Sequence, residues 1–302
     1  MKIIDSHIHL VQCIAGTTSG GEMRPAGGGR GQTVDGTVYQ LIPPFLGENQ
    51  VTPEAALKVM DEFQVERTVL LQGNFMGFQN LYSWEAQQRY PARFLAAAAY
   101  DPFSMKRDAI VKRLFEELGF RVVKHELSTG SGLMANHGVL PLDGELLERE
   151  FSYADDHDLV CVVDIGKLGS KSAQVEALRR VIRRHGSMKF VVCHVLAPKQ
   201  EQHDIWRQGM EALALPNVWF DLAALSSNLR PDTPPYPVTR QFIGEAVEMA
   251  GSDRLLFGSD LPSTLCSHQY GDLIRCVSEH PGLSMEQRQQ ILYDNALGVF
   301  WG

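Results

Sequence analysis

Eight short apolar segments, each the length of one β-strand and separated from the next by a stretch with helical periodicity, constrain the fold of this chain more than any other feature. In their cores Val, Ile, Leu and Phe occupy both odd and even positions, as expected of strands buried on both faces. The segments are Lys2–Ile8, Thr68–Gln72, Phe94–Ala98, Arg121–Glu126, Leu159–Ile165, Lys189–Val195, Val218–Leu222 and Arg254–Ser259. This alternation predicts βαβ units and therefore a parallel sheet.

The intervening stretches predict the helices that join these strands. In Pro53–Phe63, for example, Ala56, Leu57 and Met60 form one apolar stripe behind a suitable N-cap, Thr52. The other expected helices are Trp84–Tyr90, Ser104–Leu118, Gly144–Asp156, Ser172–His185, Ile205–Leu213, Arg240–Met249 and Glu286–Phe300. Eight strands with interleaved helices predict the α/β class and, within it, a (β/α)₈ TIM barrel made by one domain over residues 1–302.

Charge and cysteine content exclude several classes of partner. Asp and Glu total 36 against 28 Lys and Arg, a net charge of −8, so we expect no nucleic-acid partner. The chain has neither an apolar run long enough for a membrane span nor the apolar core of a signal peptide at its start, so we expect a cytoplasmic protein without membrane contact. Five cysteines without a Cys-x-x-Cys pair predict reduced thiols.

A segment of about forty residues between the first strand and its helix breaks the βα rhythm. It contains the glycine-rich runs Gly16–Gly21 and Ala26–Gly31. In a barrel such a connection leaves at the C-terminal face, where active sites are built. It is interpreted as a lid or entrance loop, the alternative being a surface insertion, and Arg24 and Arg30 are candidates for binding a substrate carboxylate from it.

Polar residues follow three of the expected strands. The first ends in Asp5-Ser6-His7-Ile8-His9, and because side chains two apart share one face of a strand, His7 and His9 both point into the barrel mouth. His194 ends the sixth strand and Asp260 the eighth. Two imidazoles, a third histidine and a carboxylate on one rim predict a divalent-metal site.

These motifs resemble those of a known family. The Asp-x-His-x-His after strand one, the strand-six histidine and Phe257–Pro262 (Phe-Gly-Ser-Asp-Leu-Pro) are similar to the amidohydrolase superfamily, in its amidohydrolase-related branch of decarboxylases and lactonases. The resemblance implies that His7 and His9 bind metal and that Asp260 is a ligand or general base. It implies that His194 activates metal-bound water or, as in other branches, binds a second metal.

Two positions depart from the family pattern. Where relatives have His-x-Gly after strand five, this chain has Asp164-Ile165-Gly166, and strand six is followed by His194–Pro198 instead of His-x-Gly-Gly. Asp164 is predicted as an oxygen ligand, which shifts the metal preference from zinc towards manganese or magnesium. The alternative is that Asp164 only pairs with a nearby cation.

The remaining candidates follow strands four, seven and eight. Lys124 and Glu126 share one face of strand four; in some relatives a strand-four lysine, carbamylated, or a glutamate bridges two metals, so a second metal stays open. The alternative is a pair on the rim, with Lys124 orienting an anionic substrate group. Asp221 either lines the site or caps the following loop, and His268, in the loop after Asp260, is a candidate substrate contact.

Together these features predict a metal-dependent hydrolase that cleaves a C–O or C–N bond in a lactone or cyclic amide. The substrate is a small, carboxylated molecule, and the cofactor is one divalent ion, zinc or manganese. The alternatives are non-oxidative decarboxylation of an aromatic or muconate-type acid and, outside enzymology, a metabolite-binding barrel. Relatives often form dimers, so a homodimer is compatible with the resemblance.

Overall fold

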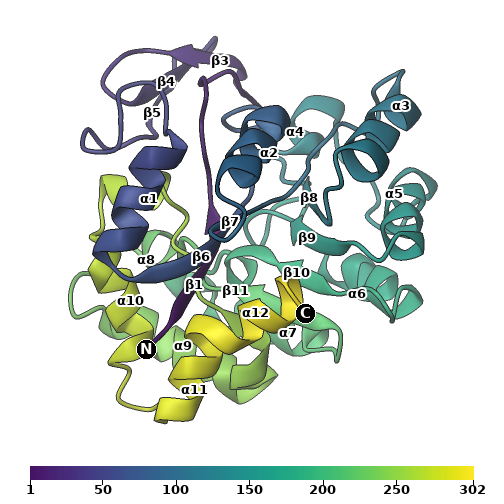
Figure 1. Cartoon of the computed structure of the whole chain (residues 1–302). Coiled ribbons are helices and arrows are strands. Elements are labelled where there is room, and N and C mark those ends of the chain that lie inside the picture. The colour runs from purple at the N-terminus through teal and green to yellow at the C-terminus, as the bar shows by residue number, and fades with distance from the viewer.

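The computed structural model describes all 302 residues and is organised around eight parallel strands (Figure 1). Seven of the strands lie within the segments expected from the sequence, and β6 overlaps its expected segment Thr68–Gln72 but begins three residues earlier. They are β1 Ile3–Ile8, β6 Val65–Leu70, β7 Phe94–Ala96, β8 Val122–Glu126, β9 Val160–Asp164, β10 Phe190–Val192, β11 Val218–Asp221 and β12 Leu255–Leu256. They pair in the orders β1-β6-β7 and β12-β11-β10-β9-β8.

Backbone hydrogen bonds join these two sheets at both seams. Between β7 and β8, the amide of Ala98 donates to the carbonyl of Val122 at 2.8 Å, and that of Lys124 donates back to Ala98. Between β12 and β1, the amide of Ser6 donates to the carbonyl of Phe257 at 2.8 Å. The strands therefore close into a ring, and the expected parallel barrel is confirmed.

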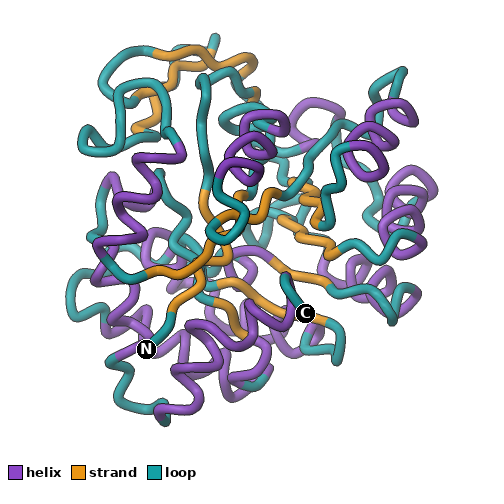
Figure 2. Tube along the Cα trace, in the orientation of Figure 1, coloured by secondary structure: helices purple, strands orange, loops and turns teal.

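Helices surround the strands on the outside (Figure 2). They are α1 Pro53–Glu62, α2 Asn80–Arg89, α3 Arg107–Val111, α4 Leu133–His137, α5 Glu145–Asp156, α6 Val175–Arg184, α7 His203–Leu213, α8 Leu225–Asn228, α9 Pro237–Ala250, α10 Tyr270–Ser278, α11 Met285–Gln289 and α12 Asn295–Phe300. Every expected helix is present, although two are interrupted by π-helical turns. None of the helices combines the length and apolar character that a bilayer-spanning segment needs.

Helix α10 was not expected, because the Ser-, Thr- and Cys-containing stretch after Asp260 indicates a loop. Its buried face consists of Tyr270, Leu273, Ile274 and Val277, at helical spacing. This apolar stripe is the sequence signal that would have predicted the helix.

The glycine-rich segment after β1 is a folded sheet and not an open loop. It forms four short antiparallel strands, β2 Thr17–Thr18, β3 Gly21–Pro25, β4 Arg30–Thr33 and β5 Val38–Gln40. Three consecutive glycines, Gly27 to Gly29, have φ of 76°, 60° and 73° at the β3–β4 turn, a conformation that glycine adopts without steric cost. The glycines thus build a turn of this sheet, which lies above the end of the barrel where β1 finishes (Figure 1).

The strands direct apolar side chains to the barrel base and polar ones to its mouth. On β8, Val122 belongs to an apolar cluster in the barrel interior, whereas Lys124 and Glu126, on the same face, line a cavity at the mouth. His125 points the opposite way and packs between the barrel and the rings of Tyr100 and Phe151. Strand periodicity alone therefore delivers charged groups to the C-terminal face.

Candidate active site

The ends of β1 and β12 bring two histidines against one carboxylate. His7 lies in β1, and His9 is the first residue after this strand. Asp260 follows β12, and its backbone amide donates to the carbonyl of His7 at 2.9 Å. The Oδ1 atom of Asp260 lies 3.2 Å from Nε2 of His9 and 3.6 Å from Nε2 of His7. His7, His9 and Asp260 form one of two side-chain groups compact enough to hold a metal ion.

Hydrogen bonds on the far side of each ring fix which nitrogen carries the proton. Nδ1 of His9 donates to the carbonyl of Leu71 at 2.9 Å, and Nδ1 of His7 donates to the Asp221 carboxylate at 3.0 Å. Each neutral imidazole then has its lone pair on Nε2, directed at Asp260. Nε2 of His7 is buried and has no hydrogen-bond partner.

Burial and charge keep these groups in the protonation states that bind a cation. Burial lowers the pKa of His7 to about 4 against the opposing effect of Asp221, and it also lowers the pKa of His9. Burial alone would raise the pKa of Asp260, but the adjacent side chains of His9, His7 and His194 hold it well below its usual range, so the carboxylate is ionised. Two neutral imidazoles and a carboxylate, with an unpartnered nitrogen among them, fit a divalent metal.

His194 and Asp164 face each other on the opposite side of the mouth. His194 stands in a tight turn, Cys193–Leu196, and its Nδ1 donates to the carbonyl of Ala223 at 2.9 Å. Its Nε2 lies 3.7 Å from Oδ2 of Asp164, and its ring centroid lies 4.9 Å from that of His7. Asp164 is not part of the compact group formed by His7, His9 and Asp260.

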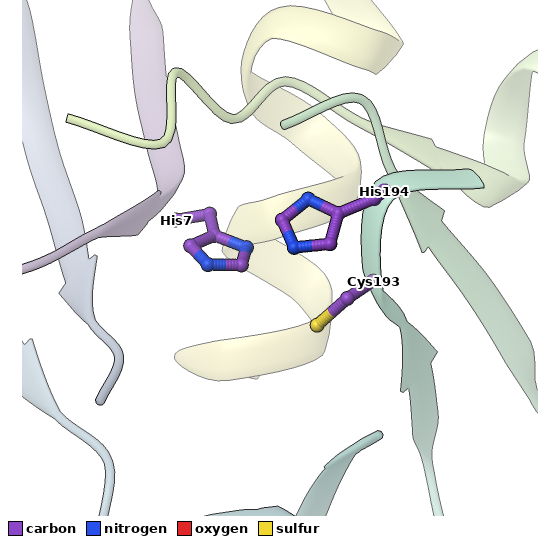
Figure 3. A group of neighbouring side chains, drawn as sticks. All are labelled: His7, Cys193 and His194. Carbon is purple, nitrogen blue, oxygen red and sulfur yellow. The ribbon is translucent and has the colours of Figure 1, made fainter. Parts of the chain in front are cut away.

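A second compact group consists of His7, Cys193 and His194 (Figure 3). The two rings lie side by side in this view, with the thiol of Cys193 below them. Burial and then the Asp221 carboxylate raise the pKa of Cys193 well above its ordinary value, which disfavours the thiolate that a metal requires. The group containing Asp260 is therefore the better candidate.

Lys124 and Glu126 complete the floor of the mouth. Lys124 is 4% exposed and makes no ion pair within 4.0 Å. Burial opposes its charge, but Cys193, Glu126 and the two cavity aspartates together raise its pKa. The Glu126 carboxylate accepts a hydrogen bond from the Ser131 hydroxyl at 2.8 Å. Lys124 is therefore a buried, charged donor without a protein partner.

These residues line a cavity that opens outwards. The inner part, about 180 Å³, is bordered by His9, Lys124, Glu126, Asp164, His194 and Asp260. An outer part of about 480 Å³ shares Asp164, His194 and Asp260 with it and is bordered by hydroxyl side chains. The β2–β5 sheet contributes Thr18, Ser19 and Tyr39 to its wall, as an entrance element would.

Three candidate substrate contacts lie elsewhere. Arg24 is exposed on β3 and donates to Gln32, while Arg30 donates to the carbonyl of Gly27; both are held within the β2–β5 sheet and neither borders the cavity. His268 is buried, and its Nδ1 pairs with the hydroxyl of Tyr236 at 2.9 Å. None of the three borders the cavity in this structure, so substrate contact by these residues stays a prediction.

For Asp221 the sequence allowed two positions, lining the site or capping the following loop, and the structure shows the cap, with the carboxylate placed behind His7. Its carboxylate caps the loop after β11 by accepting from the amide of Ala223 at 3.1 Å, and it contacts the site through His7. It does not border the cavity. Sequence spacing offered no signal for the His7 contact, because the two residues lie 214 positions apart.

Comparisons with known proteins agree with this geometry. Residues 4–300 match the amidohydrolase family, and the chain belongs to it. A search of curated proteins finds no match.

Solved structures share the fold at low sequence identity. A probable 2-pyrone-4,6-dicarboxylic acid hydrolase from Acinetobacter baumannii, with citric acid bound, has a TM-score of 0.70 and 15% identity, with 100% of both chains covered. A zinc-bound amidohydrolase from Burkholderia multivorans has a TM-score of 0.72 and 18% identity, covering 100% of this chain and 99% of the other. The 2,6-dihydroxybenzoate decarboxylase from Rhizobium has a TM-score of 0.58 and 16% identity, covering 82% of this chain and 87% of the other.

Proposed function

We propose that this protein is a metal-dependent hydrolase that opens a lactone or cyclic amide carrying a carboxylate. His7, His9 and Asp260 hold one divalent ion, zinc or manganese, and Asp164 is the candidate fourth ligand. The proposal rests on one observation. The Nε2 lone pairs of His9 and His7 point at Oδ1 of Asp260, 3.2 and 3.6 Å away, with no hydrogen-bond donor between them. Three acceptors in such contact repel one another unless a cation lies among them.

The chain's own residues provide the proton transfers. A bound divalent ion supplies Lewis acidity, which polarises a carbonyl and lowers the pKa of water towards about 7. Asp260, ionised and bordering the cavity, accepts a proton from the attacking water. His194, whose pKa is raised by Asp221, Asp164 and Asp260 against the effect of burial, protonates the leaving oxygen or nitrogen as the bond to the carbonyl carbon breaks.

Lys124 gives the proposal its substrate class. Its ammonium group is buried in the inner cavity and lacks a protein counter-ion within 4.0 Å, so a carboxylate on the substrate can take that place. The inner cavity accepts a small molecule, and the structurally similar Acinetobacter hydrolase holds citric acid.

Metal analysis with matched variants tests the proposal. We expect about one zinc or manganese per chain in the wild type, none in His7→Ala, and a lower content in Asp164→Ala if Asp164 is a ligand. Full metal content and activity in His7→Ala would refute the assignment. The metal-loaded protein is then assayed against lactones, cyclic amides and aromatic acids. Acid release without carbon dioxide supports hydrolysis, whereas carbon dioxide from an aromatic acid would replace it with decarboxylation.

A further inference from the structure

Asp221 is a fully enclosed acidic side chain beside the site, and it does not border the cavity. It ends β11, its side chain is 0% exposed, and its carboxylate accepts hydrogen bonds from three protein N–H groups. A buried carboxylate is costly without partners, so its surroundings must compensate for the charge. Its partners are the neighbours of the proposed ligands.

The two oxygens of Asp221 have different tasks. Oδ2 accepts from Nδ1 of His7 at 3.0 Å. Oδ1 accepts from two backbone amides, those of His194 at 2.8 Å and Ala223 at 3.1 Å. The carbonyl of Ala223 in turn accepts from Nδ1 of His194 at 2.9 Å. One carboxylate thus connects the ring of His7 to both the backbone and the ring of His194.

The backbone that Asp221 holds is strained. From His194 to Ala197 four successive non-glycine residues have positive φ, of 60°, 42°, 67° and 46°. Each such residue is disfavoured, a β-branched valine most of all, and persists only where surrounding contacts enforce it. The bond from Asp221 to the amide of His194 is a contact of this kind.

We propose that Asp221 is a positioning residue, which fixes His7 in the tautomer protonated on Nδ1 and holds His194 in its turn. The effect on metal binding rests on the function proposed above, whereas the effect on the tautomer does not. A ligating histidine commonly donates its second N–H to a carboxylate, and loss of that partner weakens metal binding by roughly 10- to 100-fold.

The arrangement makes Asp221→Asn a sharp test. The carboxylate accepts from three N–H groups, but an amide has one oxygen. If that oxygen faces the amides of His194 and Ala223, the NH₂ group faces Nδ1 of His7 and must donate to it. His7 would then carry its proton on Nε2, the atom that faces Asp260, and could no longer bind a metal there.

Asp5 provides a matched control on the same barrel. It is also 0% exposed, and its Oδ1 also accepts from two backbone amides, those of His7 at 3.1 Å and Ser259 at 3.0 Å. Its Oδ2 accepts from the hydroxyl of Tyr270 at 2.6 Å. That hydroxyl can rotate and accept from an amide instead, so Asp5→Asn should leave the His7 tautomer unchanged.

The experiment is nitrogen NMR of histidine-labelled, metal-free protein at neutral pH, with the His7 signals assigned by their loss in His7→Gln. We expect His7 to be protonated on Nδ1 in the wild type and in Asp5→Asn, and on Nε2 in Asp221→Asn. Zinc titration should show roughly 10- to 100-fold weaker binding in Asp221→Asn alone.

The outcomes separate the two proposals. An Nδ1-protonated His7 in Asp221→Asn would overturn the role of Asp221. The wild-type spectrum tests it even if that variant does not fold, because Nε2 protonation there would overturn it equally. A wild type that binds no divalent ion, yet shows the tautomer change in Asp221→Asn, would refute the metal-dependent function and support the positioning role.

Discussion

Two buried charged clusters on opposite faces of β8 differ in how completely their charges are matched. On the outside of the barrel, the Glu150 carboxylate accepts from the Tyr100 hydroxyl at 2.6 Å and from Nε of Arg107 at 2.9 Å. At the mouth, Asp260 faces two imidazole lone pairs, and the ammonium of Lys124 has no counter-ion within 4.0 Å. The charges of the outer cluster are all paired within the protein, whereas those at the mouth lack partners that a bound ion or substrate would supply.

Buried charges with complete partners stabilise the fold, whereas buried charges without partners are available for binding. The buried ion pair between Glu150 and Arg107 joins α5 to the first residue of α3, and removal of one partner leaves the other charge unpaired. The facing acceptors of His7, His9 and Asp260 and the unpaired ammonium of Lys124 destabilise the ligand-free protein. A bound cation and a bound anion would remove this cost, which indicates a binding role for these groups. The predictions below alter one cluster while the other serves as reference.

The largest expected effect is on stability, from Glu150→Gln. Its removal leaves Arg107, whose side chain is 10% exposed, without its carboxylate, and breaking a buried pair costs about 3 kcal/mol or more. We expect thermal unfolding roughly 5–10 °C lower, with unchanged metal content. The control is Glu54→Gln, which breaks an exposed pair with Arg89 and should change stability by less than about 1 kcal/mol. Equal effects of the two variants would contradict the contrast.

A divalent metal should stabilise the protein only through the site formed by His7, His9 and Asp260. At a free concentration about 100 times its Kd, a divalent ion adds about 2.7 kcal/mol to the stability of the folded state. We therefore expect zinc or manganese to raise the melting temperature of the wild type and of Glu150→Gln by roughly 5 °C, and to leave His7→Ala unchanged. A rise of equal size in His7→Ala would show that the ion binds elsewhere.

The barrel could be predicted from sequence because its strands are buried on both faces and read as continuous apolar runs. Their ends could not be predicted as well. The run Arg254–Ser259 yields only Leu255–Leu256 as strand, because the chain there is already turning towards Asp260. The β2–β5 sheet was missed because it covers the barrel mouth more than a core, so it has no apolar alternation, as in Gly21–Pro25.

For the site, two-residue periodicity correctly placed His7 beside His9, and it correctly placed Lys124 and Glu126 at the cavity. The facing of His194 and Asp164 depends on a left-handed turn whose contacts come from Asp221, a residue distant in sequence. Local patterns carry no information on such contacts. The positions of Arg24 and Arg30 away from the cavity were equally beyond the reach of local patterns, since the fold of the inserted sheet decides where they point.

Lys124→Met tests the unmatched cation directly. Loss of a charge-assisted hydrogen bond to a substrate carboxylate, worth about 1.5–3 kcal/mol, should raise KM by roughly 10-fold or more, with metal content unchanged. The control is Lys167→Met, because Lys167 is exposed at the rim of the outer cavity, where water screens its charge. If Lys124→Met abolished metal binding and left KM of the residual activity unchanged, the lysine would belong to the metal site and not to the substrate.

The smallest expected effect is the pH dependence of the complete cluster. Burial would raise the pKa of Glu150, but Arg107 and Tyr100 outweigh it and lower the pKa below the ordinary 4.5. A carboxyl whose pKa is lowered by folding stabilises the protein above its unfolded pKa, and this contribution is lost as the pH falls through the folded value. The stability difference between wild type and Glu150→Gln should therefore be constant from pH 7 to about 5.5 and shrink below 4.5. Urea unfolding at both ends of this range measures it, and a difference that grew on acidification would show that Glu150 is protonated in the folded protein and that the two clusters are not distinguished by charge matching.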